Sequence, residues 1–304
     1  MRHVRIWQYV DEAARCGSIR RAAERLNITP SALQRRIQDV EEDLGTELFE
    51  RTPSGVKLTA AGEIFIHWIR SHTAALQHAQ SRIEDLSGLR RGQVRIACSQ
   101  AMAVSFLPAE IETFRSEYPM VRFSVMVNDH GTAIAALRQY EADLALVFQP
   151  ERYADFQPLM AIGQRLMAIF AKGHPLEQKA TVRLRECADY PLALADRSFS
   201  GRRIVDDIMA SVSTPMQVEL ESNSFELLRN FVRRGRAVML QIELGAVEDL
   251  PDSGLVGRPI DDRDLAFGSL VLGQLKGRTL PVAVAKFADQ IARRMDQLRT
   301  LPTV

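Results

Sequence analysis

Four hydrogen-bonding side chains stand close together near the N-terminus and could recognise another molecule: Ser31, Gln34, Arg35 and Gln38. They belong to the segment that begins ITPSALQRRI at residue 28, in which Thr-Pro-Ser marks the start of a helix. Arginine and glutamine pair with the edges of guanine and adenine in the major groove of DNA. A solvated helix face also carries such residues, so the neighbouring sequence has to decide between the two interpretations.

The helix after Thr29, here called the recognition helix, has an apolar side that fixes where these four residues point. The i, i+4, i+7, i+11 spacing of a buried face is followed by Leu33, Ile37, Val40 and Leu44. At about 100° per residue, the polar side chains lie opposite. Residues 1–38 hold eight arginines and three acidic residues, whereas residues 39–50 hold six acidic residues and no basic one. This gradient favours insertion of the first helical turns into a major groove.

Two shorter helices position the recognition helix. Residues 4–16 carry apolar side chains at helical spacing, and Gly17 with Ser18 supplies a C-cap followed by an N-cap. Residues 19–26 form the next helix, which Asn27 ends. Because only a few residues separate this helix from the recognition helix, the pair is a helix-turn-helix.

A small hairpin follows the helix-turn-helix. After Gly45 the run ELFERTPSGVKLT has a Thr-Pro-Ser-Gly turn between short apolar stretches, which is typical of a hairpin and here of a wing. Arg51 and Lys57 flank its tip. Together with Arg20 they are candidate contacts to backbone phosphate, although a solvated role remains an open alternative for each.

Residues 17–63, GSIRRAAERLNITPSALQRRIQDVEEDLGTELFERTPSGVKLTAAGE, resemble the winged helix-turn-helix of the LysR-type transcriptional regulators in length, order and motif. The chain departs from the usual family pattern at Pro30-Ser31 and at Gln34, so the resemblance implies the fold and does not carry over a base preference.

A long helix over residues 59–90 connects this region to the rest of the chain. Its apolar positions recur at a period near that of a coiled coil, in a seam formed by Ala61, Phe65, Trp68, His72, Ala75, Ala79, Ile83 and Leu86. Packing against its own domain would produce the same stripe. The family resemblance implies an antiparallel-type dimer of linker helices, with Phe65, Trp68, His72 and Ile83 as candidate dimerisation residues.

In residues 91–304 strand and helix patterns alternate, which predicts parallel sheets with right-handed crossovers. The resemblance implies a two-lobed α/β regulatory domain similar to periplasmic binding proteins, with lobe I over about 91–162 and 268–304 and lobe II over about 163–267. The expected fold is thus α+β and multidomain, with a winged helix-turn-helix over 1–58, a linker helix over 59–90 and the regulatory domain after it.

Ligands of such sheets bind beyond the carboxyl ends of the strands, where helices begin. The small or polar residues expected there are Ser99, Gln100, Ala101, Asp129, His130, Gln149, Ser198, Phe199 and Gln241. They predict a polar pocket for a small hydrogen-bonding effector. Ser99 matches the serine with which the family usually contacts its effector. Simple helix capping is the alternative for Ser99, Asp129, Ser200 and Ser224.

Two other functions compete with a ligand-controlled regulator. An enzyme would use Ser99 or Cys98 as a nucleophile with His130 as its base, but no nucleophile elbow, metal spacing or phosphate loop supports it. A redox sensor would use Cys98 and Cys187, whose spacing does not resemble that of the peroxide-sensing members of the family.

The expected protein is a regulator and not an enzyme, and its composition is that of an ordinary globular protein. The 304 residues have a formal net charge of +1 and no apolar stretch long enough for a membrane span, and three widely spaced cysteines fit a reducing compartment. We therefore expect a cytoplasmic protein without cofactor or metal. Its expected partners are double-stranded operator DNA, a small-molecule effector and a second copy of the chain, with a homotetramer and RNA polymerase as further candidates.

Overall fold

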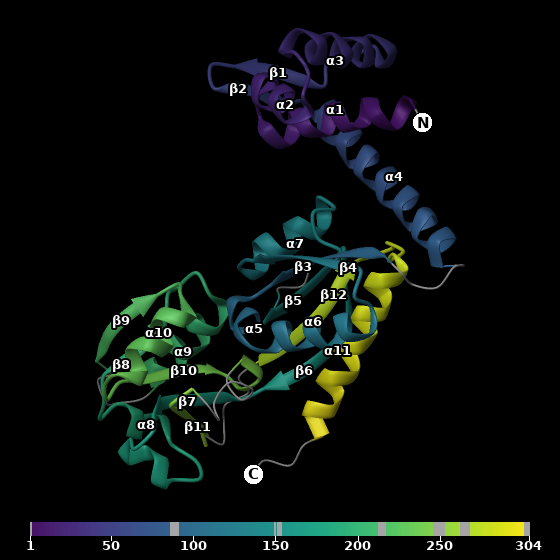
Figure 1. Ribbon diagram of the computed structural model, residues 1–304. Coiled ribbons are helices and arrows are strands. Elements are labelled where there is room, and N and C mark those ends of the chain that lie inside the picture. Colours follow the sequence, from purple (N-terminus) through teal and green to yellow (C-terminus); the bar gives the residue numbers. More distant parts are fainter. Residues whose placement is uncertain are drawn as a thin grey trace. The chain divides into compact units, whose positions relative to one another are not determined.

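Figure 1 shows a computed structural model of the chain, which describes residues 2–85, 91–148, 150, 154–211, 217–245, 253–261 and 268–300. The chain divides into two compact units, Met1–Gln80 and Ser81–Val304. Within the described ranges, no helix has the length and apolar character needed to cross a bilayer.

The first unit contains the three predicted helices and the predicted hairpin. Its elements are α1 (Arg2–Cys16), α2 (Ile19–Leu26), α3 (Pro30–Leu44), β1 (Phe49–Thr52), β2 (Gly55–Leu58) and the start of α4 (Ala60–Asp85). The Ser18 hydroxyl caps α2, and the Thr29 hydroxyl accepts a hydrogen bond from the N–H of Ala32 in α3. Asn27 ends α2 in the left-handed conformation with φ 53°. Short-range signals therefore fix these boundaries.

The apolar face of α3 is shorter than predicted. Leu33 and Ile37 are buried, but Leu44 is 45% exposed, so its assignment to the buried face was wrong. In the last turns of α3 the Glu41 carboxylate contacts the segment that follows the helix. It accepts hydrogen bonds from the N–H groups of Leu48 and Phe49 at 2.7 and 3.1 Å. The turn that leads into the wing is thus held by a polar contact.

The wing is anchored on the turn between α1 and α2. The N–H of Val56 donates to the carbonyl oxygen of Gly17 at 3.0 Å. A Cβ atom at Gly55, whose φ is +139°, would lie 2.1 Å from that same oxygen. Only glycine permits this approach of two backbones, so Gly55 sets the position of the hairpin.

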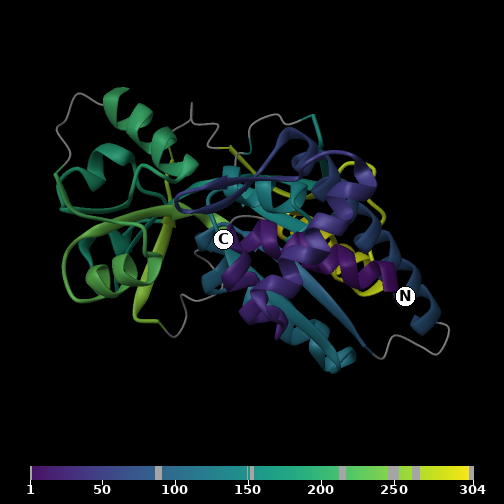
Figure 2. The same ribbon diagram turned by 90° about the horizontal axis from the view of Figure 1, so that it is seen from above.

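The second unit has two lobes, each built on a five-stranded sheet (Figures 1 and 2). The first sheet has the order β4-β3-β5-β12-β6, from strands β3 (Gly92–Cys98), β4 (Val121–Val127), β5 (Leu144–Phe148), β6 (Phe156–Gln164) and β12 (Gly268–Leu275). Helices α5 (Gln100–Val104), α6 (Phe106–Glu117), α7 (His130–Arg138) and α11 (Val282–Thr300) accompany it. As predicted, the last helix returns to the first lobe, where it packs on β3 and β6.

The second sheet has the order β11-β7-β10-β8-β9, from β7 (Leu166–Ala171), β8 (Leu192–Ala195), β9 (Val218–Ser222), β10 (Val238–Ile242) and β11 (Leu255–Pro259). Its helices are α8 (Leu184–Cys187), α9 (Ser200–Ser211), α10 (Phe225–Arg233) and the short η1 (Pro175–Gln178) and η2 (Glu243–Gly245). The chain passes between the sheets at residues 164–166 and again between residues 259 and 268, close to the predicted crossings.

Two expectations about this unit need correction. The sheets are not wholly parallel, because β12 runs antiparallel to β5 and β6, and β7 runs antiparallel to β10 and β11. The helix predicted after Ser99 is split into α5 and α6 at Ser105. Pro108 explains the break, because proline cannot donate a hydrogen bond to the carbonyl of Val104 and its ring clashes with that group.

Candidate functional site

The polar side of α3 is open to solvent. Ser31, Arg35 and Gln38 are exposed and Gln34 is half-buried, opposite the buried Leu33. Arg35 forms no hydrogen bond or ion pair with any described residue. Its neighbour Arg36 lies over the ring of Tyr9, with 5.0 Å from the guanidinium carbon to the ring centroid. Of the two adjacent arginines, therefore, only Arg36 is engaged with its own domain.

The three basic candidates around α3 differ in their surroundings. Arg20 is 83% exposed at its side chain and pairs loosely with Glu24 at 3.3 Å. In the wing, Arg51 lies opposite Val56, whereas Lys57 lies opposite Glu50. Successive residues of a strand point to opposite faces, so Arg51 and Lys57 lie on different faces of the hairpin. A duplex can therefore contact both side chains only if its backbone passes on both sides of the wing.

Helix α4 presents two different faces. Ile66 and Ile69 are buried in the core of the first unit. The candidate dimerisation residues are less enclosed: Phe65 is half-buried, His72 is exposed, Trp68 is 39% exposed and Ile83 is 66% exposed. Trp68 stacks on Phe65 with 5.7 Å between ring centroids. Packing on its own domain therefore reaches part of the predicted seam: Phe65 packs against the core of the first unit, and the rings of Trp68 and His72 lie 5.1 and 6.5 Å from the ring of Trp7 in α1. Leu86, the last residue of the seam, lies outside the described residues.

A pocket lies between the two lobes at the carboxyl ends of the strands. It holds about 670 Å³ of empty space, counting its open mouth. The first lobe contributes Ser99, Ala101, Asn128, Asp129, His130 and Phe148, and the second Leu166, Leu194, Ala195, Phe199, Gly201, Arg202, Val205, Phe225, Leu240, Gln241 and Ile242. Six of the nine predicted effector residues line it, but most of the lining is apolar, so the expectation of a polar pocket was wrong.

Ser99 and Asp129 occupy equivalent positions before helices and behave differently. Asp129 caps α7, since its carboxylate accepts hydrogen bonds from the N–H and the hydroxyl of Thr132 at 3.0 and 2.6 Å. Burial alone would raise the pKa of Asp129, but these hydrogen bonds outweigh it and lower the pKa. The Ser99 hydroxyl forms no cap, and its buried oxygen has no hydrogen-bond partner among the described residues. Capping thus accounts for Asp129 and does not account for Ser99.

Two predicted effector residues that the structure describes, Gln100 and Ser198, do not line the pocket. The side-chain oxygen of Gln100 accepts a hydrogen bond from the N–H of Phe225 in the other lobe. Ser198 donates its hydroxyl to the carboxylate of Asp196. Gln149 lies outside the described residues.

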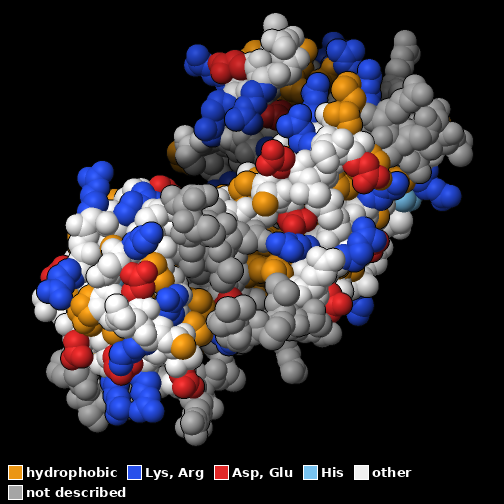
Figure 3. Space-filling view, turned by 60° about the horizontal axis from the view of Figure 1, so that its bottom comes forward, with side chains coloured by type: hydrophobic (Ala, Val, Ile, Leu, Met, Phe, Trp, Pro, Cys, Tyr) orange, Lys and Arg blue, Asp and Glu red, His pale blue; other side chains and the backbone are white. Residues whose placement is uncertain are grey.

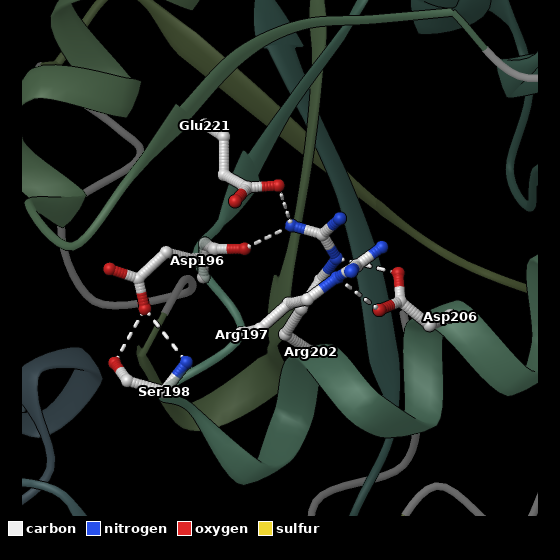
Figure 4. A network of polar contacts seen from close by, with 7 residues as sticks. Asp196, Arg197, Ser198, Arg202, Asp206 and Glu221 are labelled. Atoms are coloured by element: carbon white, nitrogen blue, oxygen red, sulfur yellow. Dashed lines mark hydrogen bonds and ion pairs between the residues drawn. The ribbon is translucent and has the colours of Figure 1, made fainter.

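Arg202 in α9 is a pocket residue that the sequence did not single out. Figure 4 shows its ion pairs with Asp206 and Glu221. Arg202 is only 5% exposed, and its Nη1 donates to Glu221 and to the Ala195 carbonyl at 2.6 Å each, while Nε donates to Asp206 at 2.7 Å. Burial would lower its pKa, but the hydrogen bonds to Asp206 and Glu221 outweigh burial and raise it. In the sequence, GRR at the start of a helix is typical of a solvated face, which is why Arg202 was missed.

The cysteines proposed for redox sensing are inaccessible. Cys98 and Cys187 are both fully buried, the first in β3 and the second at the end of α8. Burial raises the pKa of Cys98 to about 12. Because the thiolate is the form that reacts with peroxide, this environment makes Cys98 chemically inert at neutral pH. The surroundings of Ser99 do not favour the enzyme alternative either, since no described base forms a hydrogen bond with its hydroxyl.

Figure 3 shows basic and acidic side chains interspersed on the visible face, in keeping with the net charge of +1.

The domains described above are matched by family models. Residues 4–63 match the family described as "Bacterial regulatory helix-turn-helix protein, lysR family", and residues 87–296 match "LysR substrate binding domain". The chain belongs to the LysR family: it is a DNA-binding transcriptional regulator with an effector-binding domain.

Individual relatives support this assignment. The HTH-type transcriptional regulator CbbR of Sinorhizobium medicae (strain WSM419) is 32% identical over 221 residues, which cover 72% of this chain and 70% of that protein. The transcriptional dual regulator GltC of Bacillus subtilis (strain 168) is 28% identical over 222 residues, 73% of this chain and 74% of that protein. These relatives are transcriptional regulators.

Solved structures share the fold along nearly the whole chain. A full-length OxyR variant from Pseudomonas aeruginosa superposes with a TM-score of 0.70 and 22% identity, covering 95% of this chain and 94% of that one. Full-length CbnR in complex with its target DNA superposes with a TM-score of 0.61 and 18% identity, covering 96% and 99%. Operator DNA, an effector and further copies of the chain are the partners of this class of regulator.

Proposed function

We propose that the four polar residues of α3 read operator DNA in the major groove, and that basic residues of α2 and the wing contact its phosphates. The reading residues are Ser31, Gln34, Arg35 and Gln38, and the phosphate contacts are Arg20, Arg51 and Lys57. The exposed polar face of α3, opposite a buried apolar one, supports this assignment. Their setting on a fold that CbnR uses to bind its target DNA supports it further.

The effector binds in the pocket between the lobes. The observation that carries this proposal is the buried hydroxyl of Ser99, which lines the pocket and lacks a hydrogen-bond partner among the described residues. An unsatisfied buried hydroxyl is costly, and a bound ligand that pairs with it recovers that free energy. His130 and Gln241 line the same space from opposite lobes, so a ligand there contacts both.

The functional unit is a homodimer formed through the seam of α4, in which Ile83 is the most exposed of the apolar candidate residues, and RNA polymerase and a homotetramer are further candidate partners. Effector binding biases the two lobes toward one arrangement and thereby changes the spacing of half-sites that the dimer accepts. In this scheme residues 1–58 bind DNA, 59–90 dimerise and 91–304 sense the effector. The protein acts in the cytoplasm and catalyses no reaction.

A screen of small molecules by thermal shift tests the pocket. A ligand at about 100 times its Kd stabilises the chain by about 2.7 kcal/mol. Ser99→Ala should weaken the binding of such a ligand by about 1 kcal/mol or more. Ser105→Ala is the matched control, because its hydroxyl is also buried and unpartnered but does not line the pocket. Equal effects of the two substitutions would place the effector elsewhere.

A further inference from the structure

The walls of the interlobe pocket are dominated by aromatic and aliphatic side chains. Phe199 and Phe225 meet edge to face with 5.5 Å between ring centroids. Phe148 enters from the first lobe, and its ring lies 3.6 Å from where a Cβ atom at Gly201 would stand, so the ring is within van der Waals reach of the first turn of α9. Planar apolar surface therefore faces the pocket from both lobes.

The positive charge in the pocket is already balanced. Arg202 forms ion pairs with Asp206 and Glu221, and its Nη1 also donates to a backbone carbonyl (Figure 4). Asp129 adds a further carboxylate to the lining, and that carboxylate is occupied in capping α7. An anionic ligand would bring another negative charge beside an arginine that is shared by two carboxylates, at the cost of losing its own hydration.

The hydrogen-bonding groups of the pocket suit a neutral polar group on the ligand. The Ser99 hydroxyl can donate one hydrogen bond and accept others. Arg202 retains one terminal nitrogen, Nη2, that makes no hydrogen bond within the described residues. These groups can satisfy a hydroxyl or carbonyl oxygen without needing a formal charge on the ligand.

We propose that the effector of this protein is an uncharged small molecule with an apolar ring and one hydroxyl or carbonyl group. The ring lies among Phe148, Phe199 and Phe225, and the polar group pairs with Ser99. This inference rests on the proposed location of the effector site, and it goes further by excluding simple carboxylates as the preferred ligand.

Calorimetry on the full chain with a matched set of ligands tests the inference. The probes are 2-phenylethanol, phenylacetate and phenethylamine, which share one ring and differ in charge, together with succinate, which has charge and no ring. At neutral pH the Kd of 2-phenylethanol should be lower than that of phenylacetate by about tenfold, which corresponds to about 1.4 kcal/mol. Succinate should not bind measurably at millimolar concentration.

A charge variant sharpens the test. Glu221→Gln removes one of the two carboxylates that neutralise Arg202, so it should raise the affinity for phenylacetate several-fold and leave that for 2-phenylethanol unchanged. Glu219→Gln is the control, because it removes the same charge from an exposed position on the same strand.

The possible outcomes separate this inference from the proposed pocket. Tighter binding of phenylacetate or succinate that is lost in Ser99→Ala would overturn the inference and keep the pocket. If none of the ring compounds binds, the inference is also overturned. Binding of 2-phenylethanol that is indifferent to Ser99→Ala would overturn the proposed site itself.

Discussion

The side-chain oxygen of Gln100 lies 2.9 Å from the backbone nitrogen of Phe225 and accepts its hydrogen bond, which joins the first turn of α5 to the first turn of α10. The two helices belong to different lobes, and Phe225 also lines the pocket. Gln100 therefore forms a hydrogen bond between the lobes beside the pocket, a role that differs from the effector contact expected of it.

Replacing Gln100 by Ala should remove this hydrogen bond between the lobes and leave the N–H of Phe225 without its partner. The loss should lower the folding stability by about 1 kcal/mol. We expect faster amide hydrogen exchange at the start of α10 and weaker binding of any pocket ligand. Gln100→Glu keeps an oxygen acceptor and should behave more like the wild type. Unaltered exchange at Phe225 in the alanine variant would show that other contacts hold the lobes together.

Replacing Arg35 by Ala should weaken operator binding by about 1–3 kcal/mol with little loss of folding stability, because Arg35 is exposed and has no partner among the residues that the structure describes. A gel-shift titration at fixed salt measures the effect. Arg35→Lys keeps the charge and loses the planar fork, so retained affinity in the lysine variant would indicate a phosphate contact and not a base contact. Full affinity in Arg35→Ala would contradict both roles.

Replacing Ile83 by Glu should disrupt the dimer, because the side chain is 66% exposed in the single chain and lies on the proposed seam. Dimer and operator binding should be lost together, since one half-site alone binds weakly. Sedimentation at micromolar concentration measures the mass. Gln77→Glu is the control, because Gln77 is exposed on the same helix about 120° away from Ile83. A dimeric Ile83→Glu variant would require another interface.

The pH dependence of stability should include a contribution from His174. Its Nδ1 accepts the N–H of Leu176 at 3.2 Å, and the side chain is buried between the rings of Phe170 and Tyr190. Burial lowers the pKa of His174, and this effect outweighs the hydrogen bond to the Arg236 carbonyl, which raises it.

The folded state thus favours neutral His174. The stabilisation is complete above the unfolded pKa of about 6.5 and is lost as the pH falls from there through the folded pKa. Thermal melting at pH 7.5 and at lower pH measures the loss, which should shrink in His174→Gln. An identical pH profile in that variant would assign the acid sensitivity to other groups.

The parts that sequence predicted well are those set by neighbouring residues. Ser18, Asn27 and Thr29 specify helix ends through their own hydrogen bonds and conformations, so the helix-turn-helix was readable. Leu44 was misjudged because its burial depends on the path of the chain after α3. The split at Ser105 was missed although Pro108 signals it directly.

The location of the pocket was predictable from the sequence, but its mostly apolar lining was not. The ends of parallel strands identified Ser99 and Asp129, since they depend only on strand order. The apolar lining comes from residues such as Val205 and Leu240, which read as ordinary core until two lobes face each other. Arg202 looked like a surface charge because its partner Glu221 lies on a strand that is distant in sequence.

The described ends of the second passage between the lobes lie beside the first passage, since Gly268 at the start of β12 pairs with Gln164 at the end of β6, and Pro259 pairs with Met167. A single residue, Arg165, separates β6 from β7, and its carbonyl accepts the N–H of Glu243. Because the first crossing consists of one residue, few backbone torsions at that point can change the relation between the two sheets. A change of ligand in the pocket would therefore have little local freedom there to separate the lobes.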